Sequence, residues 1–203
     1  MMTNPEIKSF WDSLPVWDGT DYLTEFVDSL PLKEGTERER TWRNLTQWLT
    51  DVYLNSIGAT LNDRCLIVEG PDGSICNQLY KMLMPMNSMI GAYDWNQNKW
   101  PILGKPILWN IDDWLETMTR DFYYEFVCLL RSSEFQDRPP YVKFVTTCVR
   151  SVSFMGTSQN RDWMDPAHKD YFLFLPIEGR SFESWPSDKV SQMWSQVKAL
   201  ATP

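Results

Sequence analysis

A glycine-bounded turn between a predicted strand and a predicted helix is the part of the chain best suited to bind phosphate. The apolar run Arg64–Glu69 predicts a strand, and the sequence Gly-Pro-Asp-Gly follows it at Gly70–Gly73. A strand, a glycine-rich loop and a helix, in that order, carry the motif G-x-x-x-x-G-K-S/T. The amides of that motif cradle phosphates, while its lysine and hydroxyl contact phosphate and Mg²⁺. The chemistry to test is therefore nucleotide binding and hydrolysis.

The motif is incomplete at the positions that act on phosphate. Ile75 stands at the second glycine, Cys76 at the lysine and Asn77 at the hydroxyl residue. A side chain in place of glycine keeps the backbone away from phosphate, and loss of the lysine removes the positive charge. The positions that align with the motif are Gly70, Pro71, Asp72, Gly73, Ser74, Ile75, Cys76 and Asn77. The joint loss argues against triphosphate hydrolysis, and the alternative interpretation is an ordinary turn.

Two further groups of polar residues end predicted strands. Asp112 and Asp113 follow an apolar run, where a carboxylate pair could hold Mg²⁺ and orient an attacking water. Without an upstream lysine, the favoured interpretation is that they cap the following helix. The second group consists of Thr157, Gln159 and Asn160. An amide there could lie between a nucleotide phosphate and water, and the alternative is a turn after a core strand.

The distribution of charge along the chain limits where nucleic acid could bind. The net charge is −8, and residues 1–63 account for −6 of it, whereas proteins that neutralise phosphates usually have a basic face. The stretch 138–150 is the exception, with no acid and three bases: Arg138, Lys143 and Arg150. These are candidate contacts for single-stranded DNA, with aromatic stacking. The alternative is a solvated strand pair.

The chain contains 11 tryptophans, some of them in loop-like segments. The loop tryptophans are Trp95, Trp100, Trp163 and Trp185. If exposed, they would mark an interface, because tryptophan is enriched at binding hot spots. An acidic, tryptophan-rich surface that competes for the basic site of another protein is a further alternative.

Cysteine spacing and hydropathy indicate the cellular compartment and limit the metals and cofactors that the chain is expected to bind. No C-x-x-C occurs and His168 is the single histidine, so no zinc site is expected. Three cysteines lie in apolar runs and are predicted to be buried, which is typical of a reducing compartment: Cys65, Cys128 and Cys148. No apolar window reaches about 18 residues, and no signal sequence is visible. We expect a cytoplasmic protein without membrane contact, metal or cofactor.

Helices and strands alternate in the middle of the sequence. Apolar spacing predicts helices over 21–30, 76–84, 114–130 and 187–200, and one that begins at a capping box of Thr36 and Glu39 and ends at Gly58. Strands are predicted over 64–69, 106–111, 141–147, 149–157 and 171–176. This pattern predicts an α/β fold with a three-layer core over 61–203. An N-terminal helical lead-in over 1–60 precedes it, and the two are expected to form one compact unit.

Five stretches, taken in order, resemble the virulence-associated E family of phage and mobile-element proteins. They are Phe10–Gly19, Val68–Gly73, Lys105–Asp113, Arg138–Tyr141 and Phe154–Pro166. The resemblance covers roughly residues 10–178. It implies a P-loop NTPase-like fold of the AAA+ or superfamily 3 helicase type, often attached to primase modules.

The departures from this family fall at the phosphate site. Its G-K-S/T is absent, and its paired arginines after the aspartate-proline are replaced by Asp170 and Tyr171. The resemblance therefore implies a catalytically inactive ATPase-like module that binds or scaffolds an unidentified protein partner, in an oligomeric state that the sequence leaves open. The alternative is an atypical nucleotide-binding, helicase-like ATPase of mobile-element DNA replication. It would use ATP and Mg²⁺ and recruit Lys81 or an arginine of another subunit.

Overall fold

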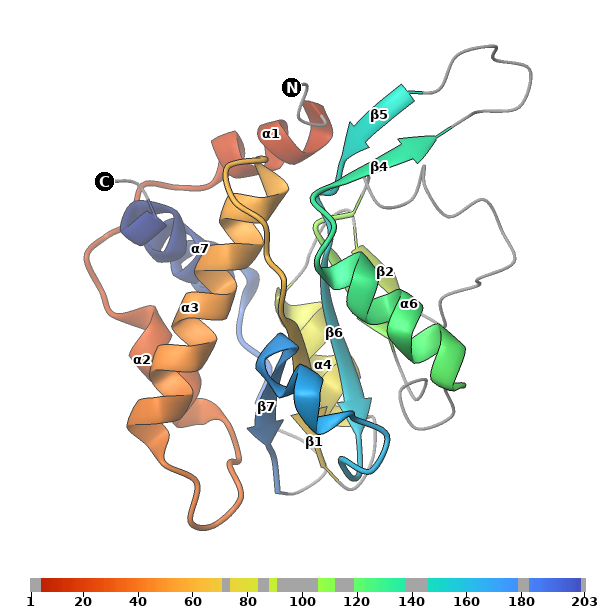
Figure 1. Ribbon diagram of the computed structural model, residues 1–203. Helices are drawn as coiled ribbons and strands as arrows, with labels where there is room; N and C mark the ends of the chain where they lie inside the picture. Colours follow the sequence, from red (N-terminus) through yellow and green to blue (C-terminus); the bar gives the residue numbers. More distant parts are fainter. Residues whose placement is uncertain are drawn as a thin grey trace.

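Five parallel strands form the centre of the molecule (Figure 1). The computed structural model describes residues 5–70, 74–83, 88–90, 106–111, 119–137, 146–178 and 183–201. The strands are β1 (Cys65–Glu69), β2 (Ser88–Ile90), β3 (Leu108–Ile111), β6 (Ser153–Ser158) and β7 (Phe172–Pro176), in the order β2-β3-β6-β1-β7. Because each neighbouring pair is parallel, the carboxyl ends of all five meet at one edge of the sheet.

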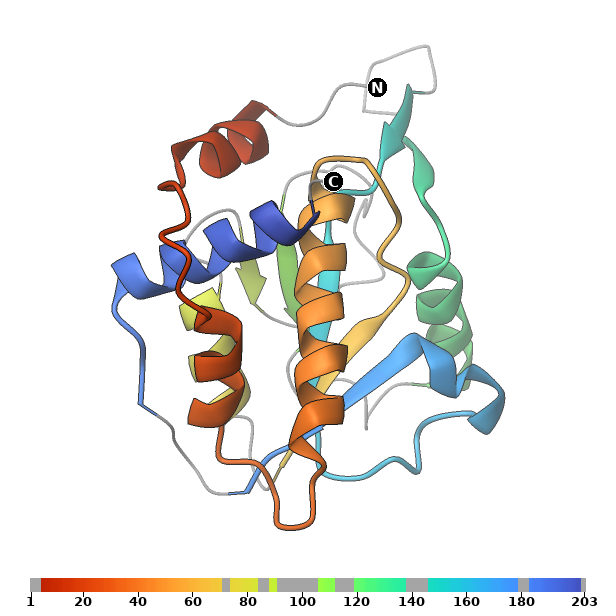
Figure 2. The same ribbon diagram turned by 90° about the vertical axis from the view of Figure 1, so that its left-hand side faces the viewer.

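Helices cover both faces of this sheet, as Figures 1 and 2 show. The described helices are α1 (Pro5–Ser13), α2 (Tyr22–Ser29), α3 (Arg38–Ser56), α4 (Ser74–Leu83), α6 (Arg120–Leu130), the 3₁₀-helix η1 (Pro166–Tyr171) and α7 (Ser187–Ala201). One hydrophobic cluster joins α1, α2, α3, α4 and α7 to the sheet, and a second joins α6 to the opposite face. The predicted α/β class is therefore confirmed. None of the described helices combines the length and apolarity needed to cross a bilayer.

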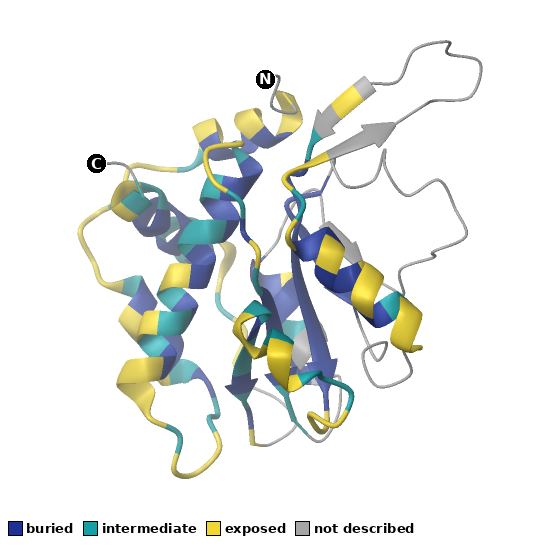
Figure 3. Cartoon of the chain, in the orientation of Figure 1, coloured by how far each residue is buried: buried dark blue, intermediate teal, exposed yellow. Residues whose placement is uncertain are grey.

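The apolar runs explain the central strands. β1 and β6 are buried along almost their whole length, which is typical of parallel strands covered by helices on both sides (Figure 3). Successive side chains of β1 point to opposite faces: Leu66 and Val68 join the first cluster, whereas Cys65 and Ile67 join the second. This alternation fixes which face each polar residue at the end of β1 occupies.

The N-terminal segment and the C-terminal helix pack together in one layer. Trp11 of α1 and Trp194 of α7 lie edge to face, with ring centroids 5.3 Å apart. Trp11 Nε1 donates a hydrogen bond to Ser56 Oγ (2.8 Å), and Trp194 Nε1 donates one to the Leu83 carbonyl (2.7 Å). Buried indoles need such partners for their N–H groups. Trp11, Trp48 and Trp194 therefore belong to the same hydrophobic cluster.

The start of α3 differs from its prediction. The capping box predicted at Thr36 and Glu39 does not form, because α3 begins after Glu37, which caps it without a side-chain hydrogen bond. Instead, the Thr36 N–H donates to the Lys33 carbonyl (3.1 Å). This bond closes a turn in which Gly35 has a φ of 81°. The predicted C-terminal end is confirmed, because Gly58 follows the helix with a φ of 74°.

Other boundaries are also corrected. The strands predicted over 141–147 and 149–157 appear as β5 (Thr146–Val149) and β6, and β5 pairs antiparallel with an unpredicted β4 (Glu134–Asp137). The predicted helix 114–130 is described from residue 120 on, with Thr119 as its N-cap, and residues 114–118 lie outside the described part. Cys128, predicted to be buried, is exposed on α6.

Candidate functional site

The carboxyl ends of β1, β6 and β7 form the edge that carries the degenerate phosphate-loop sequence. The Gly70 N–H donates to the Ser158 carbonyl (3.2 Å), and the Ile177 N–H donates to the Glu69 carbonyl (2.8 Å). β1 and β6 are neighbours, and the segments that follow them pack on opposite faces of the sheet: α4 in the first cluster, residues 163–171 against the second. Open parallel sheets bind ligands beyond the carboxyl ends of strands at such a point. The fold therefore places the predicted loop at the edge where binding is expected.

The side chain of Ile75 is buried in the hydrophobic core. The residue lies in the first turn of α4, is 2% exposed and belongs to the cluster that α4 shares with α3 and α7. In the phosphate-binding motif this position is a glycine, which leaves the backbone open to the ligand. Cys76 and Asn77 also lie in α4, but their side chains are outside the described part, as are residues 71–73 and the predicted acids Asp112 and Asp113.

Lys81 lies at the wrong end of α4 to replace the missing lysine. It is exposed in the last turn, seven residues after Ser74, which begins the helix. At 1.5 Å per residue the two backbones are about 10 Å apart along the axis. A lysine side chain is shorter than that distance, so its ammonium group does not reach the first turn.

Arg161 and Glu69 form an ion pair that the sequence alone did not reveal. Arg161 Nη2 lies 2.5 Å from Glu69 Oε2, and Nε donates to Oε1 at 3.1 Å. The guanidinium also lies over the Phe174 ring, 4.0 Å from its centroid. Because side chains alternate along a strand, Glu69 lies on the same face of the sheet as Cys65 and Ile67. The ion pair is therefore on the face opposite α4. The only sequence signal was an arginine just after a strand, 92 residues from its partner.

The residues predicted to act as sensors lie at the end of β6 and in the turn that follows. Thr157 is buried, while Gln159 and Asn160 are exposed. Ser158 Oγ donates to the Asn160 carbonyl (2.5 Å), and Trp163 Nε1 donates to Ser158 Oγ (2.8 Å) and to the same carbonyl (2.9 Å). These bonds stabilise a turn after the core strand β6. Such a turn was the alternative interpretation of these residues.

The positions of the family's paired arginines lie in η1. Asp170 is exposed, and Tyr171 is half-buried with the Arg131 guanidinium 5.9 Å from its ring centroid. The helix is capped by Asp165, whose Oδ1 accepts a hydrogen bond from the Ala167 N–H at 2.9 Å. That bond lowers the pKa of the Asp165 carboxyl. Neither η1 nor any other described element brings together three metal-ligating side chains.

Arg150 is a correction, because it is buried rather than available to nucleic acid. It is 1% exposed, and its guanidinium donates to four backbone carbonyls at 2.7–2.9 Å. The accepting carbonyls belong to Asn62, Leu130, Ser132 and Val152. Burial lowers its pKa to about 9, so it stays charged at neutral pH. The other two predicted contacts, Arg138 and Lys143, lie outside the described residues.

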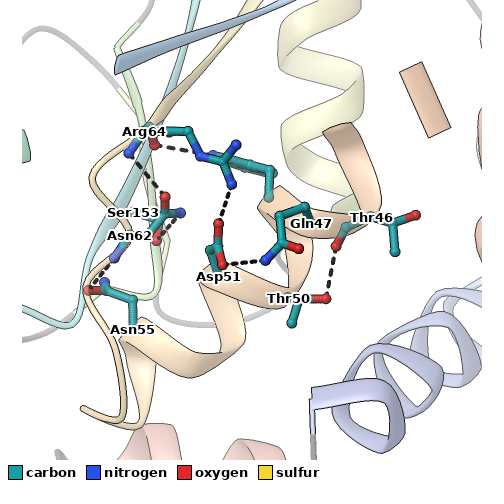
Figure 4. Close-up of polar contacts among 9 residues, drawn as sticks. Thr46, Gln47, Thr50, Asp51, Asn55, Asn62, Arg64 and Ser153 are labelled. Atoms are coloured by element: carbon teal, nitrogen blue, oxygen red, sulfur yellow. Dashed lines mark hydrogen bonds and ion pairs between the residues drawn. The ribbon is translucent and has the colours of Figure 1, made fainter. Parts of the chain in front are cut away.

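Arg150 donates to the carbonyl of Asn62, which belongs to a buried polar network at the amino end of the sheet. Figure 4 shows the part of this network formed by Asn55, Asn62 and Ser153. Asn62 Nδ2 donates to Ser153 Oγ (3.1 Å), its Oδ1 accepts the Arg64 N–H (3.2 Å), and its own N–H donates to Asn55 Oδ1 (3.2 Å). Arg64 also pairs with Asp51 of α3 at 2.5 Å. Together these bonds fasten α3 to the first residues of β1 and β6.

The fold is thus an α/β fold with a parallel sheet between two layers of helices, in which α4 is the next described element after β1. No protein-family model and no curated protein matches the sequence. Two solved apo structures of the C-terminal region of NrS-1 are similar in fold, with TM-scores of 0.59 and 0.56 at 11% identity. Each alignment covers 99% of this chain and 47% or 48% of the other, so this chain spans about half of that region.

Proposed function

We propose that the chain is a catalytically inactive, P-loop ATPase-like module of a phage or mobile-element protein that acts by binding or scaffolding a protein partner. The observation that carries this proposal is the burial of Ile75, at 2% exposure, where a phosphate-binding loop needs glycine. Cys76 and Asn77 then take the positions of the lysine and the hydroxyl residue. The strand–loop–helix unit agrees with the P-loop-like frame that the sequence resemblance implies.

The charges of the described residues support the same proposal. A triphosphate needs cations close to the start of α4. Lys81 is at the far end of that helix, and the charge of Arg161 is offset by Glu69 on the opposite face of the sheet. These residues do not fit a magnesium triphosphate. The alternative, an atypical nucleotide-binding ATPase, would need a cation other than these two.

A thermal-shift screen combined with a phosphate-release assay tests this proposal. We expect no shift of the melting temperature with ATP and Mg²⁺ and no release of inorganic phosphate above background. The matched variant carries Cys76→Lys and Asn77→Thr, which return the charge and the hydroxyl but leave Ile75 in place. A stabilisation of the wild type by several degrees with ATP, or catalytic release of phosphate, would contradict the proposal.

A second candidate function is binding of single-stranded DNA through the β4–β5 pair. These two strands form their own antiparallel sheet and project beyond the amino end of the main sheet (Figure 1). The sequence between them contains Arg138, Tyr141, Lys143 and Phe144, a mixture of cations and aromatics suited to phosphates and stacked bases. We propose these residues as the contacts because Arg150, the third predicted base, is buried.

A salt series of DNA-binding measurements tests this second candidate. The wild type should bind single-stranded DNA with an affinity that falls as salt rises. Replacement of Arg138 and Lys143 by alanine should lower the slope of log affinity against log salt by about 0.7 for each lost phosphate contact. No detectable binding, or a slope unchanged in the double variant, would exclude it.

A further inference from the structure

The strands β4 and β5, here called the arm, form a separate two-stranded sheet that projects from the main body (Figure 1). β4 follows the end of α6 and β5 leads into β6, so both strands leave the body at the same place. None of the described residues of the arm belongs to either hydrophobic cluster of the core. A two-stranded sheet on its own is only marginally stable in water. The contacts at the base of the arm therefore decide whether its strands stay paired.

One residue bonds to both strands of the arm at its base. Arg150 directly follows β5, and its Nε donates to the carbonyl of Ser132 (2.9 Å), which lies just before β4. Its Nη2 donates to the carbonyl of Leu130 (2.9 Å), the last residue of α6. The main chain adds a hydrogen bond from the Arg150 N–H to the Ser133 carbonyl (2.9 Å). Arg150 therefore ties the end of β5 to the start of β4.

The same guanidinium also bonds to the body of the domain. Nη1 donates to the carbonyl of Val152 (2.7 Å), just before β6, and Nη2 donates to the carbonyl of Asn62 (2.8 Å), in the segment before β1. Four of the five N–H donors of the guanidinium are thus used, and they connect the arm to α6 and to two segments of the body. A lysine ammonium has three donors on one atom and does not reproduce this planar arrangement.

Pairing of the arm also fixes the two ends of the segment 138–145. The last described pair of the ladder joins Asp137 to Thr146, the residues on either side of that segment. Residues opposite each other in an antiparallel pair lie about 5 Å apart. A segment whose ends are held together has less conformational entropy to lose when it binds a ligand. The segment contains Arg138 and Lys143, the bases assigned to DNA in the second candidate function.

Arg150 itself does not reach DNA, because its guanidinium lies inside the fold. The residue is 1% exposed, and its guanidinium carbon lies 5.5 Å from the centroid of the Phe154 ring of β6. We propose that Arg150 is a positioning residue of the arm: it keeps β4 and β5 paired and thereby holds together the ends of the segment that binds single-stranded DNA. This role rests on the second candidate function, DNA binding through the segment 138–145.

A disulfide across the arm measures the pairing directly. Phe135 of β4 is paired with Cys148 of β5, at a Cα separation that a disulfide spans. The starting variant carries Phe135→Cys, together with Cys128→Ser to remove an exposed thiol. The effective concentration of this thiol pair, measured against glutathione, should fall at least about tenfold when Arg150→Lys is added. Arg43→Lys, the same exchange at an exposed arginine of α3, should leave it within about twofold.

DNA binding by the same variants separates positioning from direct contact. With the thiols reduced, Arg150→Lys should weaken binding of oligo-dT at least about fivefold but leave the slope of log affinity against log salt unchanged, since no phosphate contact is lost. Oxidation should restore the affinity, because the disulfide then holds the strands together. A lower slope would show that Arg150 contacts phosphate itself. That result, an affinity that oxidation does not restore, or an effective concentration equal to that of the Arg43→Lys control would overturn the inference.

A measurement on the wild type covers the case in which Arg150→Lys does not fold. Native-state hydrogen exchange should show that the amides of β4 and β5 and the Nε–H of Arg150 open with the same free energy and the same dependence on denaturant, below those of β1 and β6. Different opening free energies for the arm amides and the Nε–H would show that the strands separate independently of Arg150, which would contradict its role.

The second candidate function fails separately from this inference. If the wild type binds no single-stranded DNA but Arg150→Lys lowers the effective concentration of the thiol pair, DNA binding falls and the anchoring of the arm by Arg150 stands. If the wild type binds DNA and Arg150→Lys changes neither the affinity nor the effective concentration, DNA binding stands and the role of Arg150 falls.

Discussion

The two ends of the parallel sheet use their polar residues in opposite ways. At the amino end, Asn55, Asn62 and Arg150 are buried and hydrogen-bonded to backbone or to each other. At the carboxyl end, the Arg161–Glu69 pair is partly exposed, with side chains 49% and 23% accessible. The amino end holds the layers together through buried bonds. The described part of the carboxyl end has the position of a ligand site, and its arginine there, Arg161, is paired with Glu69.

This difference shows that residue type alone does not distinguish a functional cation from a structural one. Arg150 and Arg161 each follow a strand closely, since β5 ends at Val149 and β6 ends at Ser158. One donates to four carbonyls inside the fold, and the other joins a carboxylate at the surface. Loss of a buried, fully bonded group should therefore cost much more stability than loss of an exposed one.

The largest effect is expected from Arg150→Met. The variant keeps most of the buried volume but removes a charged donor from four carbonyls, of which only that of Val152 keeps a second side-chain donor, Asn55 Nδ2. We expect a loss of about 4 kcal/mol in the free energy of unfolding. Urea denaturation measures it, with Arg43→Ala, an exposed arginine on α3, as the control that should change stability by less than about 0.5 kcal/mol. A loss below about 1 kcal/mol for Arg150→Met would mean that the buried hydrogen bonds at the amino end do not hold the layers together.

Ile75→Gly should have the next largest effect. It returns the residue that a phosphate loop requires, but it removes a fully buried side chain and places glycine in a helix. We expect a loss of about 3 kcal/mol or more in the free energy of unfolding. Lys81→Gly, an exposed substitution in the same helix, should cost only about 1 kcal/mol, which is the backbone part. Equal losses in the two variants would show that Ile75 is not committed to the core.

How far the sequence predicted this arrangement depends on the range of each interaction. The helix with Leu45, Trp48 and Leu49 on one face and the buried strand Cys65–Glu69 were both predicted, because local periodicity determines them. α1 was missed, since its short apolar pattern at Ile7, Phe10 and Trp11 is interrupted by charges and is stabilised by packing against α7. Glu37, not Thr36, is the N-cap, and the Thr36 N–H donates to the Lys33 carbonyl in the turn at Gly35.

The candidate site was predicted only in outline. The loop after β1 and the strand end at Ser158 follow from the order of elements, so their meeting at one edge could be anticipated. The Glu69–Arg161 pair and the buried contacts of Arg150 could not, because they join residues 18 to 92 positions apart whose proximity only the tertiary fold creates.

Removal of the ion pair at the carboxyl end should have a small effect. Arg161→Ala eliminates a pair that solvent and salt screen, so we expect a loss of about 0.5 kcal/mol in the free energy of unfolding. A double-mutant cycle with Glu69→Gln isolates the pairwise part. A coupling above about 2 kcal/mol would remove the contrast between the two ends of the sheet.

The smallest effect is expected when the pH is lowered, and it concerns the contribution of Asp165, in the segment that follows β6, to the free energy of unfolding. The pKa of Asp165 is lowered in the folded state, mainly by the hydrogen bond from the Ala167 N–H. Its contribution to stability is therefore complete above the unfolded pKa, about 3.9, and is lost as the pH falls through the lower folded value. Asp165→Asn keeps a capping side chain but does not titrate, so its urea midpoint should fall less steeply in acid than that of the wild type. Parallel curves for the two proteins would show that the Asp165 charge makes no contribution.

Isothermal titration calorimetry of the wild-type chain with ATP and Mg²⁺ tests most directly whether the carboxyl end has lost its capacity to hold a triphosphate. With Ile75 buried, Lys81 out of reach and Arg161 held by Glu69, the account predicts no heat of binding beyond dilution. A saturable isotherm of one nucleotide per chain with micromolar affinity would contradict it.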